Sequence, residues 1–273
     1  MTIKTVRQEA GKEGNMRTIS IMNLKGGVAK TTSADNMAYI LSKRGYRVLM
    51  VDNDKQGDLS RGFKRRTTSG DGTNCIMTDD EPDMETLIKH TDYENLDIIT
   101  ANLTLLNANR EVEMDVTRTH HDRIKAALNI VRDQYDFALI DCPPDLNIGV
   151  VNALCASNDV LIPVEIDDNT TEGMEELWQQ ISKIQRRLNP DLKIVKCFIS
   201  KFQKYNEAHK QGIEAVRKFY PTMKTVIRTS PIVAKSTFVK EPVVKYSPRA
   251  AASVDYESLV TEYLDAIGER QNG

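Results

Sequence analysis

The sequence feature that most constrains this chain is a loop rich in glycine and lysine at residues 22–32. The apolar run at residues 19–22 predicts a buried strand before the loop, and residues 31–42 predict a helix after it. Glycines in such a turn let backbone N–H groups point at phosphate oxygens, and the helix start adds partial positive charge. Lys30 can reach the terminal phosphates, and the Thr31 hydroxyl can bind Mg²⁺. The sequence therefore predicts a nucleotide-phosphate site at this turn.

The same loop carries a second lysine, Lys25, and departs from the common pattern G-x-x-x-x-G-K-[ST]. Leu24 and Ala29 occupy the two glycine positions of that pattern. The residues K-G-G-V-A-K-T-T closely resemble the deviant Walker A box of the ParA/MinD family of ATPases, whose usual form has glycine in place of Ala29. In that family two subunits close face to face over two ATP molecules, and the resemblance implies that Lys25 reaches the partner's phosphates. A glycine turn with two surface lysines is the simpler alternative.

The resemblance implies a set of nucleotide contacts in this loop. The expected residues are Lys25, Gly26, Gly27, Val28, Ala29, Lys30, Thr31 and Thr32. Lys25 and Lys30 are also expected to act in ATP hydrolysis. Residue 29 raises a structural question, because a Cβ beside the phosphates forces a backbone shift if this position needs positive φ. We expect nucleotide binding to survive the alanine, and turnover to be the more sensitive property.

Acidic residues follow three further apolar runs. Asp52 and Asp54 end one run, Asp141 ends a second, and residues 165–168 follow a third. Because the carboxyl ends of parallel strands meet at one edge of a sheet, we expect these carboxylates beside the phosphate loop. Asp141 stands where a Walker B aspartate does and would hold Mg²⁺ directly or through water, with Thr31 as a second oxygen ligand. Asp52 is the weaker candidate for the site, because a structural role would explain this residue equally well.

Two short segments extend the resemblance and also depart from it. Residues 51–57, V-D-N-D-K-Q-G, resemble the family's V-D-x-D-P-Q-G, with Lys55 in place of proline. This match implies that Asp54 orients or deprotonates the attacking water, and a turn acid or helix N-cap is the alternative. Residues 141–145, D-C-P-P-D, resemble the family's D-x-P-P-S, with Asp145 adding a negative charge near the phosphates.

Apolar runs and amphipathic segments alternate along the rest of the chain. Strands are expected at 19–22, 47–51, 95–100, 137–141, 160–164 and 193–199, helices at 31–42, 84–90, 121–132 and 172–188, and a loop or lightly structured insertion at 64–82. This alternation predicts an α/β fold with a doubly wound, mostly parallel sheet and helices on both faces, and the resemblance implies a P-loop NTPase of the deviant Walker A type. Residues 1–16 are expected to form a flexible N-terminal tail, and residues 17–273 a single ATPase domain.

Charge is unevenly distributed along the sequence. The net charge is −2, yet residues 196–249 carry twelve Lys/Arg against three Glu, a balance of +9 that leaves −11 for the remainder. No run of about eighteen apolar residues is present and the N-terminus is polar, so we expect neither a membrane span nor a secretory signal. These features predict a cytoplasmic protein with one basic region.

The resemblance is greatest to ParA-type partitioning ATPases, which bind DNA without sequence preference as ATP dimers until a ParB-like partner stimulates hydrolysis. It implies a nucleoid-associated homodimer with ATP/ADP and Mg²⁺ as cofactors. Candidate contacts to DNA phosphates are Lys201, Lys204, Lys210, Arg217, Lys218, Lys224, Lys235, Lys240, Lys245 and Arg249. A solvated charged face is the alternative for any one of them. Residues 226–231 correspond to the family's adenine loop, with Arg228 and Pro231 as candidate contacts.

Two other functions stay open at this stage. A MinD-like membrane positioner needs a C-terminal helix with an apolar face and a basic face. Residues 254–267 have the apolar spacing but carry mostly acidic charge, so we expect this helix to pack on the domain. A slowly hydrolysing nucleotide switch, acting as an adaptor or corepressor, is the third possibility, and Ala29, Lys55 and Asp145 favour it.

Overall fold

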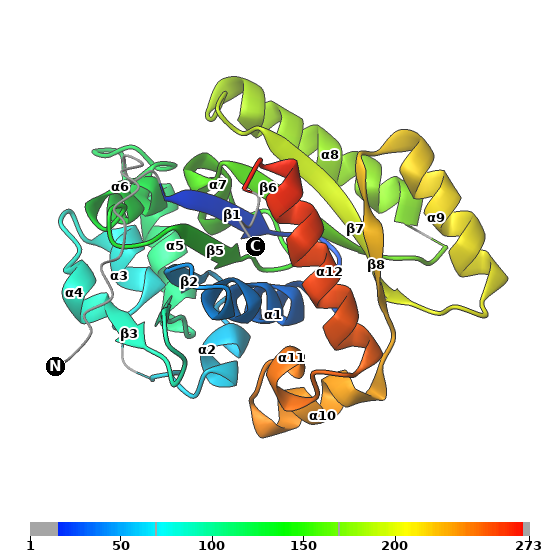
Figure 1. The fold of residues 1–273 in the computed structure, drawn as a ribbon. Helices are drawn as coiled ribbons and strands as arrows, with labels where there is room; N and C mark the ends of the chain where they lie inside the picture. Colours follow the sequence, from blue (N-terminus) through cyan, green and yellow to red (C-terminus); the bar gives the residue numbers. More distant parts are fainter. Residues whose placement is uncertain (1–15, 69, 169, 270–273) are drawn as a thin grey trace, which may run out of the picture.

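The computed structural model describes residues 16–68, 70–168 and 170–269, so the expected N-terminal tail lies outside the described residues except for Met16. An eight-stranded sheet runs through the centre of the fold, in the order β3-β4-β2-β5-β1-β6-β7-β8 (Figure 1). The strands are Arg17–Ile21 (β1), Val48–Asp52 (β2), Ile88–His90 (β3), Leu96–Ile99 (β4), Phe137–Asp141 (β5), Asp159–Glu165 (β6), Ile194–Phe202 (β7) and Thr222–Arg228 (β8). Every neighbouring pair is parallel except β3 and β4.

Helices connect these strands and lie on both faces of the sheet (Figure 1). They are Lys30–Lys43 (α1), Asp58–Gly62 (α2), Thr73–Thr78 (α3), Met84–Leu87 (α4), Thr104–Met114 (α5), Arg123–Ile130 (α6), Ile148–Ala156 (α7), Thr170–Arg187 (α8), Glu207–Phe219 (α9), Pro231–Val239 (α10), Val243–Tyr246 (α11) and Ala251–Ala266 (α12). The predicted doubly wound α/β fold is therefore confirmed, and each strand expected from the sequence is present within a few residues of its expected bounds.

The central strands are apolar on both sides, because helices cover both faces of a parallel sheet. In β2, Leu49 and Val51 face one hydrophobic core, and Val48 and Met50 face the other. The first core takes side chains from α3 to α9, whereas the second takes them from α1, α2, α11 and α12. This two-sided burial leaves the strand ends as the places where polar groups of the sheet reach solvent.

Two expectations near the sheet edge were wrong. Residues 64–82 were expected to be a loop or lightly structured, yet α3 lies within them and buries Ile76 and Met77 in the core. Residues 84–90 were expected to be one helix, yet α4 ends at Leu87 and β3 follows, pairing antiparallel with β4. The short apolar runs in these segments do not distinguish helix, strand and loop by their local pattern. Packing and strand pairing with distant segments decide which one forms.

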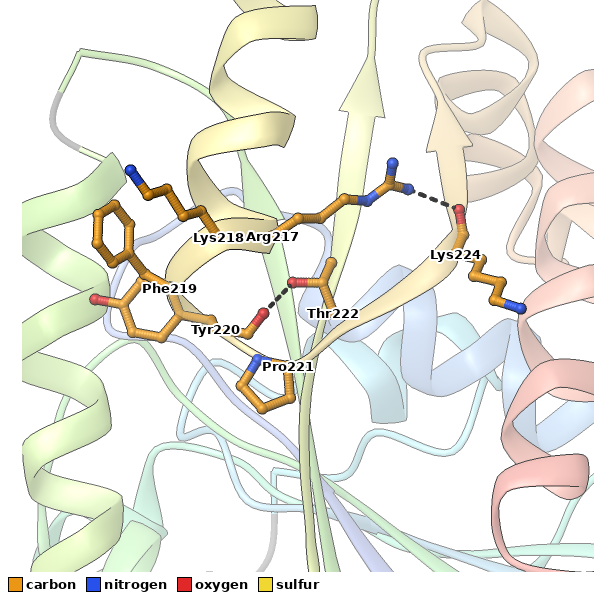
Figure 2. A pocket seen from close by; sticks show the side chains of 7 residues that line it. All are labelled: Arg217, Lys218, Phe219, Tyr220, Pro221, Thr222 and Lys224. Carbon is orange, nitrogen blue, oxygen red and sulfur yellow. Dashed lines mark hydrogen bonds between the residues drawn. The ribbon is translucent and has the colours of Figure 1, made fainter.

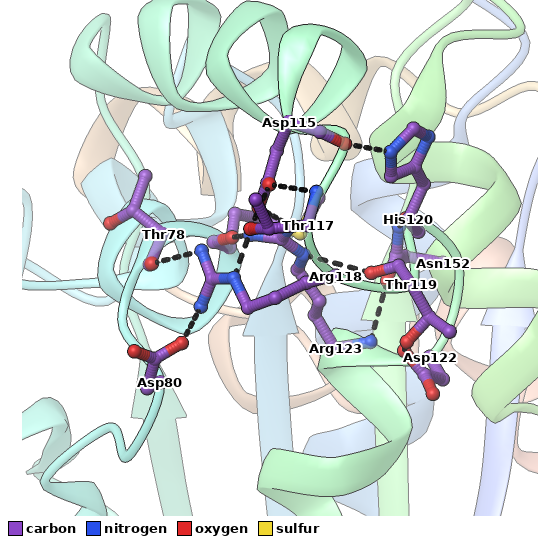
Figure 3. Close-up of polar contacts among 11 residues, drawn as sticks. Thr78, Asp80, Asp115, Thr117, Arg118, Thr119, His120, Asp122, Arg123 and Asn152 are labelled. Atoms are coloured by element: carbon purple, nitrogen blue, oxygen red, sulfur yellow. Dashed lines mark hydrogen bonds and ion pairs between the residues drawn. The ribbon is translucent and has the colours of Figure 1, made fainter.

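A polar network holds α3 against the segment that follows α5 (Figure 3). Arg118 donates to the backbone oxygen of Thr78 at 2.7 Å, and the buried Arg123 forms an ion pair with Asp115 at 2.8 Å. Hydrogen bonds from Thr117, and then from the two arginines, hold the pKa of Asp115 well below its usual range. These bonds stabilise a region whose sequence is mostly polar.

The C-terminal helix α12 packs on the domain, as its acidic face led us to expect. It lies across α1 and against β8 (Figure 1), and Leu259, Val260, Tyr263 and Leu264 are buried in the second core. The hydroxyl of Tyr263 donates to Asp159 at 2.6 Å, which fixes the helix to the start of β6. Among the residues that the structure describes, no helix is both long and apolar enough to cross a membrane.

Candidate nucleotide site

The four strand ends named from the sequence meet at one edge of the sheet. β2, β5, β1 and β6 are consecutive neighbours, so the segments that follow them lie side by side. The Asn23 side chain after β1 donates to the backbone oxygen of Pro163 in β6 at 2.8 Å, and Lys25 forms an ion pair with Asp167. The expected convergence at the carboxyl edge of the sheet is confirmed.

The phosphate loop turns through two residues in the left-handed region. Gly27 has φ of 76°, and Ala29 has φ of 72° and ψ of 31° at the N-cap of α1. A Cβ costs free energy in this conformation, which glycine adopts without penalty. The backbone oxygen of Ala29 still accepts from the Ser33 N–H at 2.9 Å, so α1 begins normally. Position 29 therefore does need positive φ, and the alanine is strained.

The two lysines of the loop occupy different environments. Lys30 is buried, and its ammonium donates to the backbone oxygen of Lys25 at 3.0 Å. Burial lowers the pKa of Lys30, whereas the carboxylate of Asp141 acts in the opposite direction. The side chain of Lys25 is 41% exposed and pairs with Asp167 at the rim. Lys30 is thus positioned within the loop, and Lys25 at its outer surface.

Asp141 carries the strongest structural indication of a cation site. Its carboxylate is buried at the end of β5, and neither oxygen has a hydrogen-bond partner among the described residues. Burial, followed by the charge of Asp52, raises its pKa well above the usual value, and the nearby Thr31 hydroxyl acts in the opposite direction. A buried carboxylate with open oxygens beside a hydroxyl matches the ligands that Mg²⁺ prefers. The residues fit the ion, which would neutralise charge on the phosphates when bound.

Asp52 and Asp54 have different roles although they are two residues apart. Asp52 is fully buried and accepts from the Ser60 N–H at 2.8 Å and the Ser60 hydroxyl at 2.6 Å. Burial raises the pKa of Asp52 to about 7. These bonds tie β2 to α2, so Asp52 has the structural role that its sequence position left open.

Asp54 faces the phosphate loop and also stabilises its own turn. It is half-buried, and its Oδ1 accepts from the Gln56 N–H at 2.9 Å. Gly57 follows with φ of 65°, where an added Cβ would lie 2.4 Å from the backbone oxygen of Ala101. The glycine permits this tight turn, which directs Asp54 toward the space over the loop. A carboxylate there can orient a water for attack on a terminal phosphate.

A cavity of about 490 Å³ lies over the loop, between Lys30 and Asp54. Its lining residues are Gly26, Gly27, Ala29, Lys30, Thr31, Thr32, Asp54, Lys55, Gln56, Asp58, Pro144 and Asp145. Asp58 and Pro144 were not named as site residues from the sequence. Asp58 directly follows the segment 51–57 and Pro144 lies within the segment 141–145, and these positions could have indicated them. The volume is typical of small-molecule sites. The cavity can hold a phosphate chain against Lys30 and Thr31, with Asp54 placed to orient water, whereas Asp141 is buried and is not one of the lining residues.

The predicted adenine contacts lie outside this cavity. Arg228 forms an ion pair with Asp255 at 2.7 Å and lines a separate cavity of about 680 Å³ beside Phe202. Pro231 is exposed in the first turn of α10. Neither residue forms a hydrogen bond or ion pair with the phosphate loop in the described part of the chain, and their adenine role stays a prediction.

The predicted DNA contacts lie on β7, α9, β8, α10, α11 and the adjoining loops. β7 and β8 are the last two strands at one edge of the sheet, and α9 lies beyond them, whereas α10 and α11 lie beside α1 and α2 (Figure 1). The basic segment of the sequence therefore divides into two groups, one on β7, α9 and β8 and one on α10, α11 and the loop after it. Three of its lysines are paired, because Lys201, Lys210 and Lys245 form ion pairs with Glu165, Glu207 and Glu241.

Comparison with known proteins agrees with the chemistry of this cavity. The family model described as an AAA domain matches residues 16–194. The chain is 35% identical to the sporulation initiation inhibitor protein Soj of Bacillus subtilis, over 90% of this chain and 97% of that protein. The chain belongs to the ParA/MinD-type ATPases.

Other members of the ParA/MinD-type family agree in length and fold. The chromosome partitioning protein ParA of Caulobacter vibrioides is 32% identical, over 94% of this chain and 97% of that protein. A putative plasmid partition protein of Borrelia burgdorferi, solved bound to AMPPNP, superposes with a TM-score of 0.78 and 25% identity, over 92% of this chain and all of that one. The chain is therefore an ATPase with the P-loop fold of this family.

Proposed function

We propose that this ATPase acts in DNA partitioning, as a switch that closes into an ATP-bound dimer, binds DNA without sequence preference and is released when a ParB-like partner stimulates hydrolysis. ATP and Mg²⁺ would occupy the cavity over the phosphate loop. The observation that carries the proposal is the group of basic side chains on β7, α9 and β8, at one edge of the sheet in an ATPase whose charge outside residues 196–249 is acidic. Its relatives named for chromosome partitioning support the same function.

Lys25 supports the dimer step. Its side chain is 41% exposed at the open rim of the phosphate loop, where its partner Asp167 is 40% exposed. An ion pair at this exposure is weak and is exchanged readily. Phosphates of a facing subunit would be a stronger partner for the ammonium, because they carry more negative charge than one carboxylate. Closure over two nucleotides would thus release Lys25 from Asp167.

The turn between α9 and β8 supports the DNA step. Figure 2 shows Lys218 and Lys224 extending from opposite sides of this turn. Both lysines are exposed, and Arg217 beside them donates to the backbone oxygen of Lys224 at 3.0 Å. Two exposed ammonium groups on a turn fixed by an arginine suit contact with a phosphate backbone, where charge matters and base identity does not.

The alternative of a membrane positioner lacks a corresponding observation. The apolar face of α12 is buried against the second core and is therefore not available to a bilayer. DNA is the polyanion that we propose for the basic side chains on β7, α9 and β8.

The test is binding to random-sequence duplex DNA with ATP, with ADP and without nucleotide, at two salt concentrations. Wild type should bind tightly only with ATP, and affinity should fall steeply with salt. Lys30→Ala should lose the ATP-dependent binding. Binding that is absent in every nucleotide state would reject the DNA function and leave the ATPase assignment intact.

A second comparison locates the surface. Lys218→Glu combined with Lys224→Glu should weaken DNA binding and reduce the salt slope by about 2. Lys43→Glu combined with Lys125→Glu makes the same charge change at exposed lysines outside the basic segment. Equal losses in the two double variants would show that only net charge matters, and not this turn.

A further inference from the structure

We propose that Lys55 is a ligand of the terminal phosphate of ATP, and that Asp145 holds it in the absence of nucleotide and competes with the phosphate for it. The pair would make the site discriminate between nucleoside triphosphate and diphosphate. The proposal rests on nucleotide binding in this cavity and is independent of the DNA and dimer steps.

The two side chains meet across the cavity that would hold the phosphates. Lys55 follows β2 directly after Asp54, and Asp145 follows β5. The Lys55 ammonium lies 3.6 Å from the Asp145 Oδ2, and both residues line the cavity that contains Lys30. The ion pair therefore joins the segment that orients water to the segment that follows Asp141.

The two partners are held to different degrees. Asp145 Oδ1 accepts from the Asn147 side-chain amide at 2.8 Å, and Asn147 itself caps α7 by accepting from the Val150 N–H at 3.1 Å. The carboxylate is thus fixed to a helix. Lys55 lies on a flexible stem with its side chain 33% exposed, and its 3.6 Å contact is longer than a direct hydrogen bond. The lysine is the partner able to move.

The charge balance of the cavity gives the direction of movement. Its ionisable lining consists of three aspartates, Asp54, Asp58 and Asp145, and two lysines, Lys30 and Lys55. A triphosphate adds several negative charges, and its terminal group carries more charge than one carboxylate. Lysine binds phosphate as a compact point charge that can follow its partner. Lys55 should therefore leave Asp145 when a terminal phosphate arrives, and a diphosphate should draw it less.

The experiment compares the dissociation constants of Mg²⁺-AMPPNP and Mg²⁺-ADP by calorimetry, with their ratio as the readout. Four full-length chains are compared: the parent, Lys55→Met, Asp145→Asn and the double variant. All four also carry Lys25→Ala, so that dimer closure does not enter the ratio. Lys89→Met is the matched control, because Lys89 pairs with Asp71 at the same 3.6 Å and a similar exposure away from the cavity.

The proposal expects opposite changes in the two single variants. Lys55→Met should weaken AMPPNP binding about tenfold and ADP binding much less, whereas Asp145→Asn should tighten AMPPNP binding about threefold relative to ADP. The double variant should keep the weak AMPPNP binding of Lys55→Met. Lys89→Met should leave both constants unchanged.

A purely neutralising role for Lys55 gives a different pattern. Lys55→Met would then weaken both nucleotides equally by exposing the phosphates to Asp145, and the double variant would return to parental affinity. That pattern would overturn the proposal. Circular dichroism of each variant checks that the fold is retained, and loss of DNA binding in wild type would not affect the ratio.

Discussion

The ammonium of Lys30 lies 3.0 Å from the backbone oxygen of Lys25, so the two lysines of the phosphate loop are joined across one turn. The bond orients the Lys30 side chain over the loop while the Lys25 side chain extends outward to Asp167. Substituting the Lys25 side chain leaves this backbone acceptor in place. The two lysines can therefore be tested separately.

Lys25→Ala should abolish ATP-dependent dimers while leaving the monomer folded. Its side chain contacts only the rim, through Asp167, so its removal costs little stability. Light scattering with and without ATP measures the dimer, and thermal unfolding checks the fold. Asp167→Asn is the matched variant, because it removes the same ion pair but keeps the lysine. Dimers that persist in Lys25→Ala would exclude a role across the interface.

Ala29→Gly should stabilise the protein by about 1 kcal/mol, because glycine relieves the cost of a Cβ at φ of 72°. Part of that gain is lost to the greater entropy of glycine in the unfolded chain. Urea unfolding measures the difference. Ala34→Gly, in the interior of the same helix, should destabilise by about 1 kcal/mol or more. A destabilised Ala29→Gly would show that this position is not strained.

Asp54→Ala should bind ATP but lose turnover by about 10²-fold or more, because no other carboxylate is expected to orient the water. Single-turnover phosphate release and nucleotide affinity separate the two effects. Asp58→Ala removes a carboxylate that lines the same cavity and pairs with Arg61, and its turnover should stay close to wild type. Full turnover in Asp54→Ala would assign the water to another group.

The sequence predicted the sheet and the strand-end site because each signal is local. A buried parallel strand is a short apolar run, and the residue at its end is read directly, as with Asp141 in β5. The phosphate loop could likewise be located directly from its glycines and lysines. The question of whether Ala29 needs positive φ followed from chemistry, but its answer required the backbone.

Relations between distant segments could not be read in this way. Lys55 and Asp145 each depart from the family pattern, and only the fold shows that they face one another. Helix α3 was missed for the same reason, because its backbone oxygens accept hydrogen bonds from Arg118 and Arg123, which lie in a distant segment. The sequence left a structural role open for Asp52, and only the fold shows that Ser60 is its partner.

Asp35 on α1 should make stability depend on pH. Its Oδ1 is buried without a hydrogen-bond partner in the described part of the chain, and burial raises its pKa well above the usual value. The folded protein therefore holds this proton more tightly than the unfolded chain. The free energy of unfolding should fall as pH rises from about 4, the pKa of an exposed aspartate, and level off above the folded-state pKa.

Asp35→Asn keeps the shape of the side chain and removes its charge. The variant should be more stable than wild type by about 1–3 kcal/mol near pH 8, and this advantage should shrink as pH falls, because wild-type Asp35 then becomes neutral too. Urea unfolding at pH 5, 6, 7 and 8 measures the trend. Asp133→Asn, at an exposed aspartate, is the control and should show no such trend. An advantage of Asp35→Asn that is the same at every pH would mean that packing, and not ionisation, separates the two side chains.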